Sequence, residues 1–291
     1  MRHEPDRYYL YSNKATALQA LAEIQEQQGD DDAALTALDR SVATFDEALA
    51  RTYDDSDLFS NKAAALGSKA RLHVKKRRFH EATAILTETI ACLDEALKRG
   101  SSPVRALGNK GLALSQLADV QCRLSDEDAA VQTYTKAFSC FEEALGWAHA
   151  ERDILIAQAG AQLRYGQLRH ALSSNVAATK GEDNRNAALG AYRAAIDTVD
   201  KVLGANTEDV NAHLYRREAL IGLAQWYEED KNYKAAVDCY RDAVICCTAM
   251  MTSTLPKIDI LYRQGQILKA RALVEGRLSL RADAIESAQA S

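Results

Sequence analysis

The stretch from Gly100 to Ala148, GSSPVRALGNKGLALSQLADVQCRLSDEDAAVQTYTKAFSCFEEALGWA, decides the fold of this chain. Its apolar residues recur at helical spacing in two blocks, one around Leu114 and one from Ala130 onward. Ser102 before Pro103 is typical of a helix start, and Ser125 predicts a capping box at the start of the second block. Because only a few polar residues separate the blocks, they predict two antiparallel helices packed as a hairpin.

This hairpin recurs along the whole chain. A leucine is followed sixteen residues later by an alanine six times, and successive leucines are 48 residues apart at every step but one, which measures 58. Such self-similarity at a fixed period predicts a stacked array of helical repeats. The leucines are Leu18, Leu66, Leu114, Leu172, Leu220 and Leu268, and the alanines are Ala34, Ala82, Ala130, Ala188, Ala236 and Ala284.

We predict one solenoid over residues 1–291. The ten extra residues are assigned to an insertion at 147–166, which is apolar enough to continue as helix and predicts an unusually long or kinked connection. The last repeat stops before its second helix is finished, and its apolar edge indicates either a piece of a longer protein or a surface that something else caps, with self-association as one way to cover it. The repeats span about 13–60, 61–108, 109–156, 167–214, 215–262 and, in part, 263–291.

Composition and charge narrow the class of protein. Charged residues break the apolar runs well before the ~18 residues that a membrane span needs, and the N-terminus has no apolar signal core. We therefore expect a cytoplasmic protein that does not bind membranes. The net charge of −5 has the wrong sign for a general nucleic-acid binder.

The sequence offers little for catalysis or metal binding. Its six cysteines form no CxxC pair, its six histidines are scattered, and no P-loop or HExxH motif is present. We therefore predict no enzyme, no cofactor and no metal site. We call the residues at the same position of successive repeats a column. One column contains three cysteines together with threonines, which indicates small, nearly apolar side chains at a helix contact: Thr44, Cys92, Cys140, Thr198 and Cys246.

The recurring motifs resemble the tetratricopeptide repeat family. The resemblance rests on Leu-x-x-Leu-Ala in the first helix, a short turn such as Gly29-Asp30, and Ala-x-x-x-Leu/Tyr-x-x-Ala in the second helix. The usual unit has 34 residues, so 48-residue units are similar to long-unit bacterial arrays. The resemblance implies an all-α fold, a right-handed α-α superhelix of about six helix hairpins with the last one incomplete. Asn-Lys pairs mark the first three units: Asn13-Lys14, Asn61-Lys62 and Asn109-Lys110.

The resemblance also implies a function. Such proteins act as non-catalytic scaffolds that bind a peptide or partner domain in a concave groove lined by the first helices, and a regulatory or sensor arm of a larger multidomain effector is an alternative. The chaperone-type pattern that clamps a terminal carboxylate is absent. In the fourth repeat the mapped stripe is His170, Ser173, Ala177 and Lys180. The candidate partner-binding residues are Asn61, Arg71, Lys75, Asn109, Asp119, His170 and Gln225.

Two features leave alternatives open. Residues 13–60 carry a net charge of −8 and residues 61–108 carry +6, with a basic run from Lys75 to Arg78. That run is either a solvated turn or a patch for an anionic partner, and weak nucleic-acid binding through it is a second alternative function. The repeated asparagines either hold a ligand's backbone amides or bond the neighbouring repeat.

Overall fold

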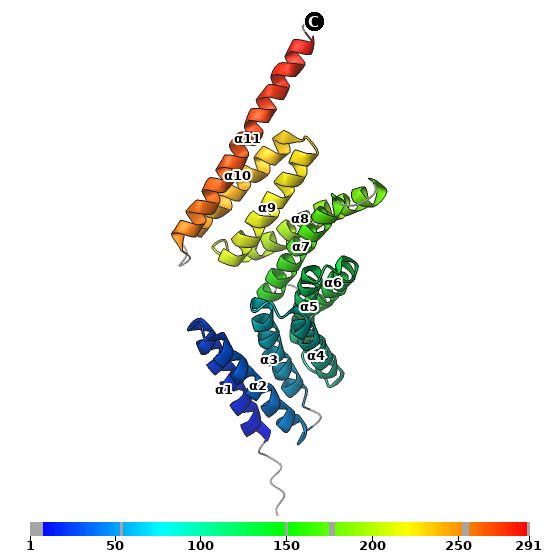
Figure 1. The fold of residues 1–291 in the computed structure, drawn as a ribbon, viewed down its shortest axis with the longest axis vertical. Helices are drawn as coiled ribbons and strands as arrows, with labels where there is room; N and C mark the ends of the chain where they lie inside the picture. The colour runs from blue at the N-terminus through cyan, green and yellow to red at the C-terminus, as the bar shows by residue number, and fades with distance from the viewer. Residues whose placement is uncertain (1–7, 53–54, 149–150, 175–177, 252–255, 290–291) are drawn as a thin grey trace, which may run out of the picture. The chain divides into compact units, whose positions relative to one another are not determined.

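The computed structural model describes residues 8–52, 55–148, 151–174, 178–251 and 256–289, and over these ranges every regular element is an α-helix (Figure 1). The predicted all-α class is therefore confirmed. The helices are α1 (Tyr8–Gln27), α2 (Asp31–Leu49), α3 (Ser56–Lys75), α4 (Phe79–Lys98), α5 (Pro103–Arg123), α6 (Glu127–Trp147), α7 (Arg152–Ser173), α8 (Ala178–Ala205), α9 (Val210–Glu229), α10 (Tyr233–Met250) and α11 (Lys257–Gln289).

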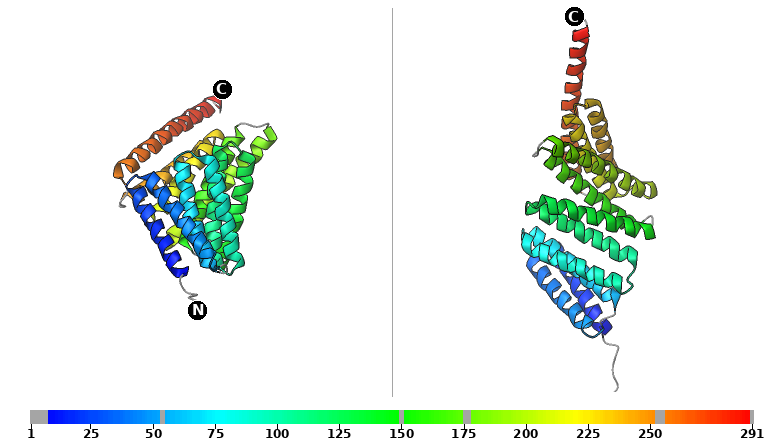
Figure 2. Two further views of the ribbon diagram at one scale, coloured as in Figure 1. Left: turned by 60° about the horizontal axis from the view of Figure 1, so that its bottom comes forward. Right: turned by 90° about the vertical axis from the view of Figure 1, so that its right-hand side faces the viewer.

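Consecutive helices pair into hairpins, from α1 with α2 to α9 with α10, and α11 packs on α10 without a second helix of its own. The chain divides into two compact units, Met1–His149 with α1 to α6 and Ala150–Ser291 with α7 to α11. Within the first unit the three hairpins lie one on another (Figure 2). Hereafter these are called unit 1 and unit 2.

Two repeat columns build the contact layer between the helices. The alanine column is fully buried at Ala34, Ala82, Ala130, Ala188 and Ala236. Four residues further along each second helix a large side chain fills the space that the alanine leaves, and these are also buried. Small and large side chains therefore interdigitate as predicted. The large residues are Leu38, Leu86, Tyr134, Tyr192 and Tyr240.

The insertion is not where we predicted it. Residues 152–173 form α7, the first helix of the fourth hairpin, so most of 147–166 belongs to a repeat helix and is not an insertion. In the other hairpins the second helix begins three residues before its column alanine, whereas α8 begins ten residues before Ala188. The extra residues thus lengthen the start of α8. Leu163, 5% exposed, fills the leucine column in place of the half-buried Leu172.

The sixth repeat also departs from the prediction, because α11 is a single helix of 33 residues (Figure 1). It buries Ile260, Ile267 and Val274 in the core of unit 2, while Leu268, which we placed in the column, is 44% exposed. The side chain of Ala284 lies outside the described residues. The opposite face of α11 exposes large apolar side chains, and self-association through them stays a prediction: Ile258, Leu261, Tyr262, Leu273 and Leu280.

The turns inside four of the hairpins, α1–α2, α3–α4, α5–α6 and α9–α10, share one local geometry. A residue with positive φ stands directly before the N-cap of the second helix, as Gly29 does before Asp30 and Ser125 before Asp126. The aspartate carboxylates then accept hydrogen bonds from the main-chain amides three residues on. The predicted capping box at Ser125 is wrong by one residue, because Ser125 adopts the left-handed conformation and Asp126 is the cap.

Arg78 occupies the same N-cap position before α4, but its side chain makes no capping hydrogen bond. Arg78→Asp is expected to raise the free energy of unfolding of the chain by about 1 kcal/mol, since a carboxylate would accept from a free amide and favour the positive end of the helix dipole. Urea unfolding followed by circular dichroism measures this gain. Arg78→Ala is the control for loss of charge alone, and equal stability of the two variants would contradict the prediction.

Candidate functional site

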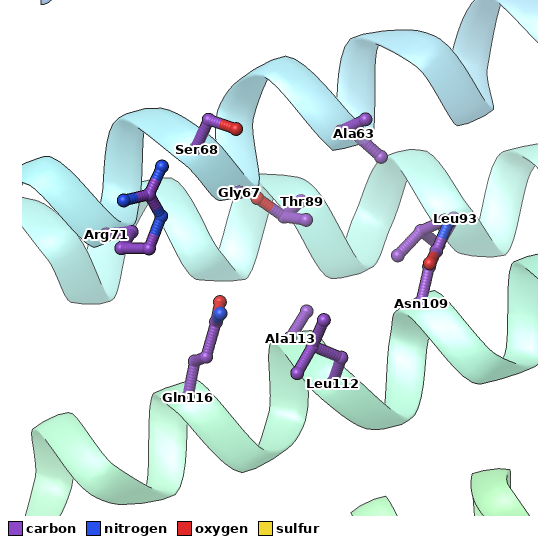
Figure 3. A pocket seen from close by; sticks show the side chains of 11 residues that line it. Ala63, Gly67, Ser68, Arg71, Thr89, Leu93, Asn109, Leu112, Ala113 and Gln116 are labelled. Carbon is purple, nitrogen blue, oxygen red and sulfur yellow. The ribbon is translucent and has the colours of Figure 1, made fainter. Parts of the chain in front are cut away.

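A cavity of about 260 Å³ opens in unit 1 between the first helices α3 and α5, with α4 contributing to its wall (Figure 3). Two predicted residues, Arg71 and Asn109, lie on opposite sides of it. The structure therefore brings together side chains that are 38 positions apart in the sequence. The lining consists of Ala63, Ala64, Gly67, Ser68 and Arg71 on α3, Thr89 and Leu93 on α4, and Asn109, Leu112, Ala113 and Gln116 on α5.

Small residues create this space. Gly67 is half-buried in the interior of α3, and a Cβ added to it would meet no atom within 4 Å. Gly111 on α5 is different, because its Cβ would come within 2.7 Å of the Phe141 ring. Packing therefore requires Gly111, whereas Gly67 only keeps the cavity open.

The polar side chains around the cavity are largely unpartnered. Within the described residues, Ser68, Asn109 and Gln116 make no side-chain hydrogen bond or ion pair, and the two amides extend from α5 toward the space beside α3 (Figure 3). Arg71, with a half-exposed side chain, donates from both terminal nitrogens to Glu26 of α1, at 2.7 Å from Nη2. That hydrogen bonding lowers the pKa of Glu26 and raises the pKa of Arg71.

Half of the basic run forms ion pairs within the chain. Lys75 Nζ lies 2.6 Å from Asp31 Oδ1, and Lys76 pairs with Asp32, so two of the four cations join the second hairpin to the acidic turn of the first. The hydrogen bond from Lys76 lowers the pKa of Asp32. The opposite charges of the first two repeats thus serve their docking. Lys75 does not reach the cavity, and the nucleic-acid alternative loses two of its cations.

Basic residues on the first helices of three repeats, two of them the lysines of Asn-Lys pairs, form ion pairs that the sequence analysis missed. Lys62, with 11% of its side chain exposed, lies 2.8 Å from both Asp46 and Glu88. Each such base follows its acid by sixteen residues, and each joins the second helix of one repeat to the first helix of the next. The spacing itself was the available signal. The pairs are Asp46 with Lys62, Asp94 with Lys110 at 2.5 Å, and Asp200 with Arg216 at 2.8 Å.

Two predicted residues of unit 1 have structural contacts instead. The backbone carbonyl of Asn61 accepts a hydrogen bond from Gln19 Nε2 at 3.3 Å, which links α1 to α3. Asp119 accepts from the hydroxyl of Tyr134 within the third hairpin. Neither residue lines the cavity.

His170 and Gln225 line a second cavity, of about 360 Å³, in unit 2. His170 Nε2 lies 3.0 Å from Glu229 Oε1, and Arg277 of α11 donates to Glu228 at 3.1 Å. Charged pairs of the chain itself therefore occupy its walls. The stripe mapped on the fourth repeat is wrong, because with Leu163 in the column His170 falls near the end of α7. Ala177 and the side chain of Lys180 lie outside the described residues.

The cysteines are unpaired thiols, and burial raises the pKa of Cys92 to about 11. Over the described ranges, no group of three or more histidine, cysteine or acidic side chains has the arrangement of a metal site. None of the helices in those ranges is both long and apolar enough to cross a bilayer.

Comparison with known proteins bears on the family. A profile described as tetratricopeptide repeat matches residues 17–44, in the first hairpin. A search of curated proteins finds no match.

Solved structures with a similar fold cover most of the chain. BtubC (BKLC) from P. vanneervenii is 17% identical with a TM-score of 0.59, covering 88% of this chain and 91% of its own. The S. pombe nuclear import adaptor Nro1 is 14% identical with a TM-score of 0.58, covering 97% and 94%. A putative kinesin light chain of Podosopora anserina with TPR-like repeats is 15% identical with a TM-score of 0.52, covering 87% and 100%. Residues 17–44 therefore match one tetratricopeptide repeat, and the chain as a whole has the all-helical, TPR-like solenoid fold of these solved structures.

Proposed function

We propose that the chain is a non-catalytic protein-interaction scaffold, and that the cavity between α3 and α5 of unit 1 binds an extended segment of a partner protein. One observation carries the proposal. Ser68, Asn109 and Gln116 present unpartnered polar groups around a space walled mainly by small and aliphatic residues. Polar side chains that form no hydrogen bond or ion pair within the described part of the chain are available to a ligand.

The chemistry of the rim suits a peptide backbone. Asn109 and Gln116 are seven residues apart on α5, which separates them by about 10 Å along the helix axis. Each amide offers both donors and an acceptor, as the main chain of an extended segment does. At about 260 Å³ the cavity is smaller than the ~300–1,000 Å³ of typical small-molecule sites. One protein of similar fold is described as a nuclear import adaptor, a role that also consists of binding other proteins.

Quantitative affinity capture with the full chain tests the proposal. The double variant Asn109→Ala, Gln116→Ala is expected to recover its specific partners at a level about tenfold lower than wild type, since two hydrogen bonds of about 0.5–1.5 kcal/mol each are lost. Gln132→Ala, an exposed amide on α6 outside the cavity, is the matched control. Equal recovery by the double variant, with unchanged thermal stability, would move the binding surface elsewhere.

A further inference from the structure

We infer that the unit 1 cavity selects segments in which an aliphatic side chain, seated over Gly67, stands next to an acidic one that meets Arg71. This inference rests on the proposed function and names the chemistry of its ligand. Three features of the cavity support it: a glycine that packing does not require, an aliphatic floor and a single charged side chain among the described lining residues.

Gly67 is unfavourable for the helix that contains it. A glycine inside a helix makes the helix less stable than an alanine does, because glycine loses more backbone conformational entropy on folding. Where other glycines are required, an aromatic ring explains them, as Tyr192 does for Gly222 at 2.6 Å. Around Gly67 nothing lies within 4 Å of the missing Cβ. Other exposed glycines such as Gly190 are also unopposed, but they do not line the cavity.

Other repeats carry a side chain at the position of Gly67. In the first repeat the position belongs to Gln19, which bonds the carbonyl of Asn61 and so links α1 to α3. In the fifth repeat it belongs to Ile221, which packs against the core of unit 2. Gly67 makes no such link between α3 and α5, and the gap that remains is the cavity.

The floor of this gap favours an aliphatic side chain. Ala113 and Leu112 of α5 and Leu93 of α4 line it, with the methyl-bearing Thr89 beside them. Its volume of about 260 Å³ leaves space for one side chain. A buried apolar side chain would remove from water the surface that is now exposed there.

The rim favours a carboxylate beside that side chain. Among the described residues that line the cavity, Arg71 is the one charged side chain and none is acidic. A guanidinium has five N–H donors, of which Glu26 takes one on each terminal nitrogen. The remaining donors can bind a second carboxylate. Glu26 is then an internal competitor for Arg71.

A defined probe tests the inference. A phage-displayed library of random nine-residue peptides is selected on the full chain, and enriched peptides are synthesised for fluorescence anisotropy. We expect an aliphatic residue adjacent to Asp or Glu in the enriched set. Gly67→Leu should weaken binding more than tenfold, and Gly190→Leu, at an open helical glycine of α8, should leave it unchanged. Gly67→Ala should weaken binding while leaving thermal stability equal or higher.

Charge variants separate the inference from the function on which it rests. Arg71→Gln should weaken acid-bearing peptides about two- to fivefold, and Glu26→Gln should strengthen them by a similar factor, the range of exposed ion pairs. If selection yields no binders, or if the binders ignore both Gly67 variants, the proposed site itself is wrong. If the Gly67 variants abolish binding but the peptides show no aliphatic-acidic pair and ignore Arg71, the site stands and only the inferred ligand chemistry is wrong.

Discussion

Tyr192→Ala is expected to lower the free energy of unfolding of unit 2 by about 3–5 kcal/mol, the usual cost of deleting a large buried aromatic ring. Tyr192 is 2% exposed and lies in α8, with its ring against Gly166 of α7 and Gly222 of α9. A Cβ on either glycine would approach the ring to within 2.9 or 2.6 Å. Because both neighbours lack side chains, neither can fill the cavity left by the ring, which favours the upper part of this range.

Urea unfolding of the full chain, followed by circular dichroism, gives the loss for Tyr192→Ala. Tyr262→Ala is the matched control, because Tyr262 is 70% exposed on α11 and its removal should change stability by no more than about 0.5 kcal/mol. A loss below about 1.5 kcal/mol for Tyr192→Ala would mean that α7 and α9 close onto the vacated space.

The contact between Tyr192 and its glycines shows how far the sequence alone reaches. The column of Leu38, Leu86, Tyr134, Tyr192 and Tyr240 follows from the 48-residue period, because each position faces the same neighbour in every hairpin. The matching glycines lie in other helices. A column comparison identifies large and small positions but does not show which ones meet across helices, so these packing partners emerge only from the structure.

The two misplaced elements show the limit of reading a period from spacing. The spacing to Ala188 favoured Leu172, whereas Leu163, 49 residues after Leu114, is the buried residue. In α11, Ser279 stands where the third hairpin has Ser125 with positive φ, so the residue type at this position does not distinguish a turn from a continued helix. Spacing identified the period but not these local choices.

The candidate site was predictable in part. Arg71 was predicted from the helical periodicity of the first helix of its repeat, and Asn109 from its recurrence in three repeats. Both residues line the cavity. The cavity itself depends on the missing side chain of Gly67, and no pattern of present residues reveals a space. Lys75 was misassigned because its partner, Asp31, lies 44 residues earlier in the previous repeat.

Asp209→Ala is expected to lower the free energy of unfolding by about 2–4 kcal/mol, because one carboxylate performs two tasks. Asp209 is the N-cap of α9, and its Oδ1 accepts from the amide of Ala212 at 3.0 Å. Its Oδ2 accepts from Arg152 Nε of α7 at 2.5 Å, and only 3% of its side chain is exposed. Asp209→Asn keeps a capping oxygen but removes the charge, so it should lose less than Asp209→Ala.

The pH dependence of this effect has a definite sign. Burial raises the pKa of Asp209, but hydrogen bonds from Arg152 and from backbone amides outweigh it, so its pKa lies below the ordinary value of 3.8. The unfolded chain then binds the proton more readily, and the stability contributed by the carboxylate is present above about pH 3.8 and is lost as the pH falls through the lower, folded-state pKa. The difference in free energy of unfolding between wild type and Asp209→Asn, measured by urea unfolding, should therefore shrink as the pH falls from 7 to ~2. A stability advantage that stayed constant over that interval would show that the charge of the Asp209 carboxylate is not what wild type gains over Asp209→Asn.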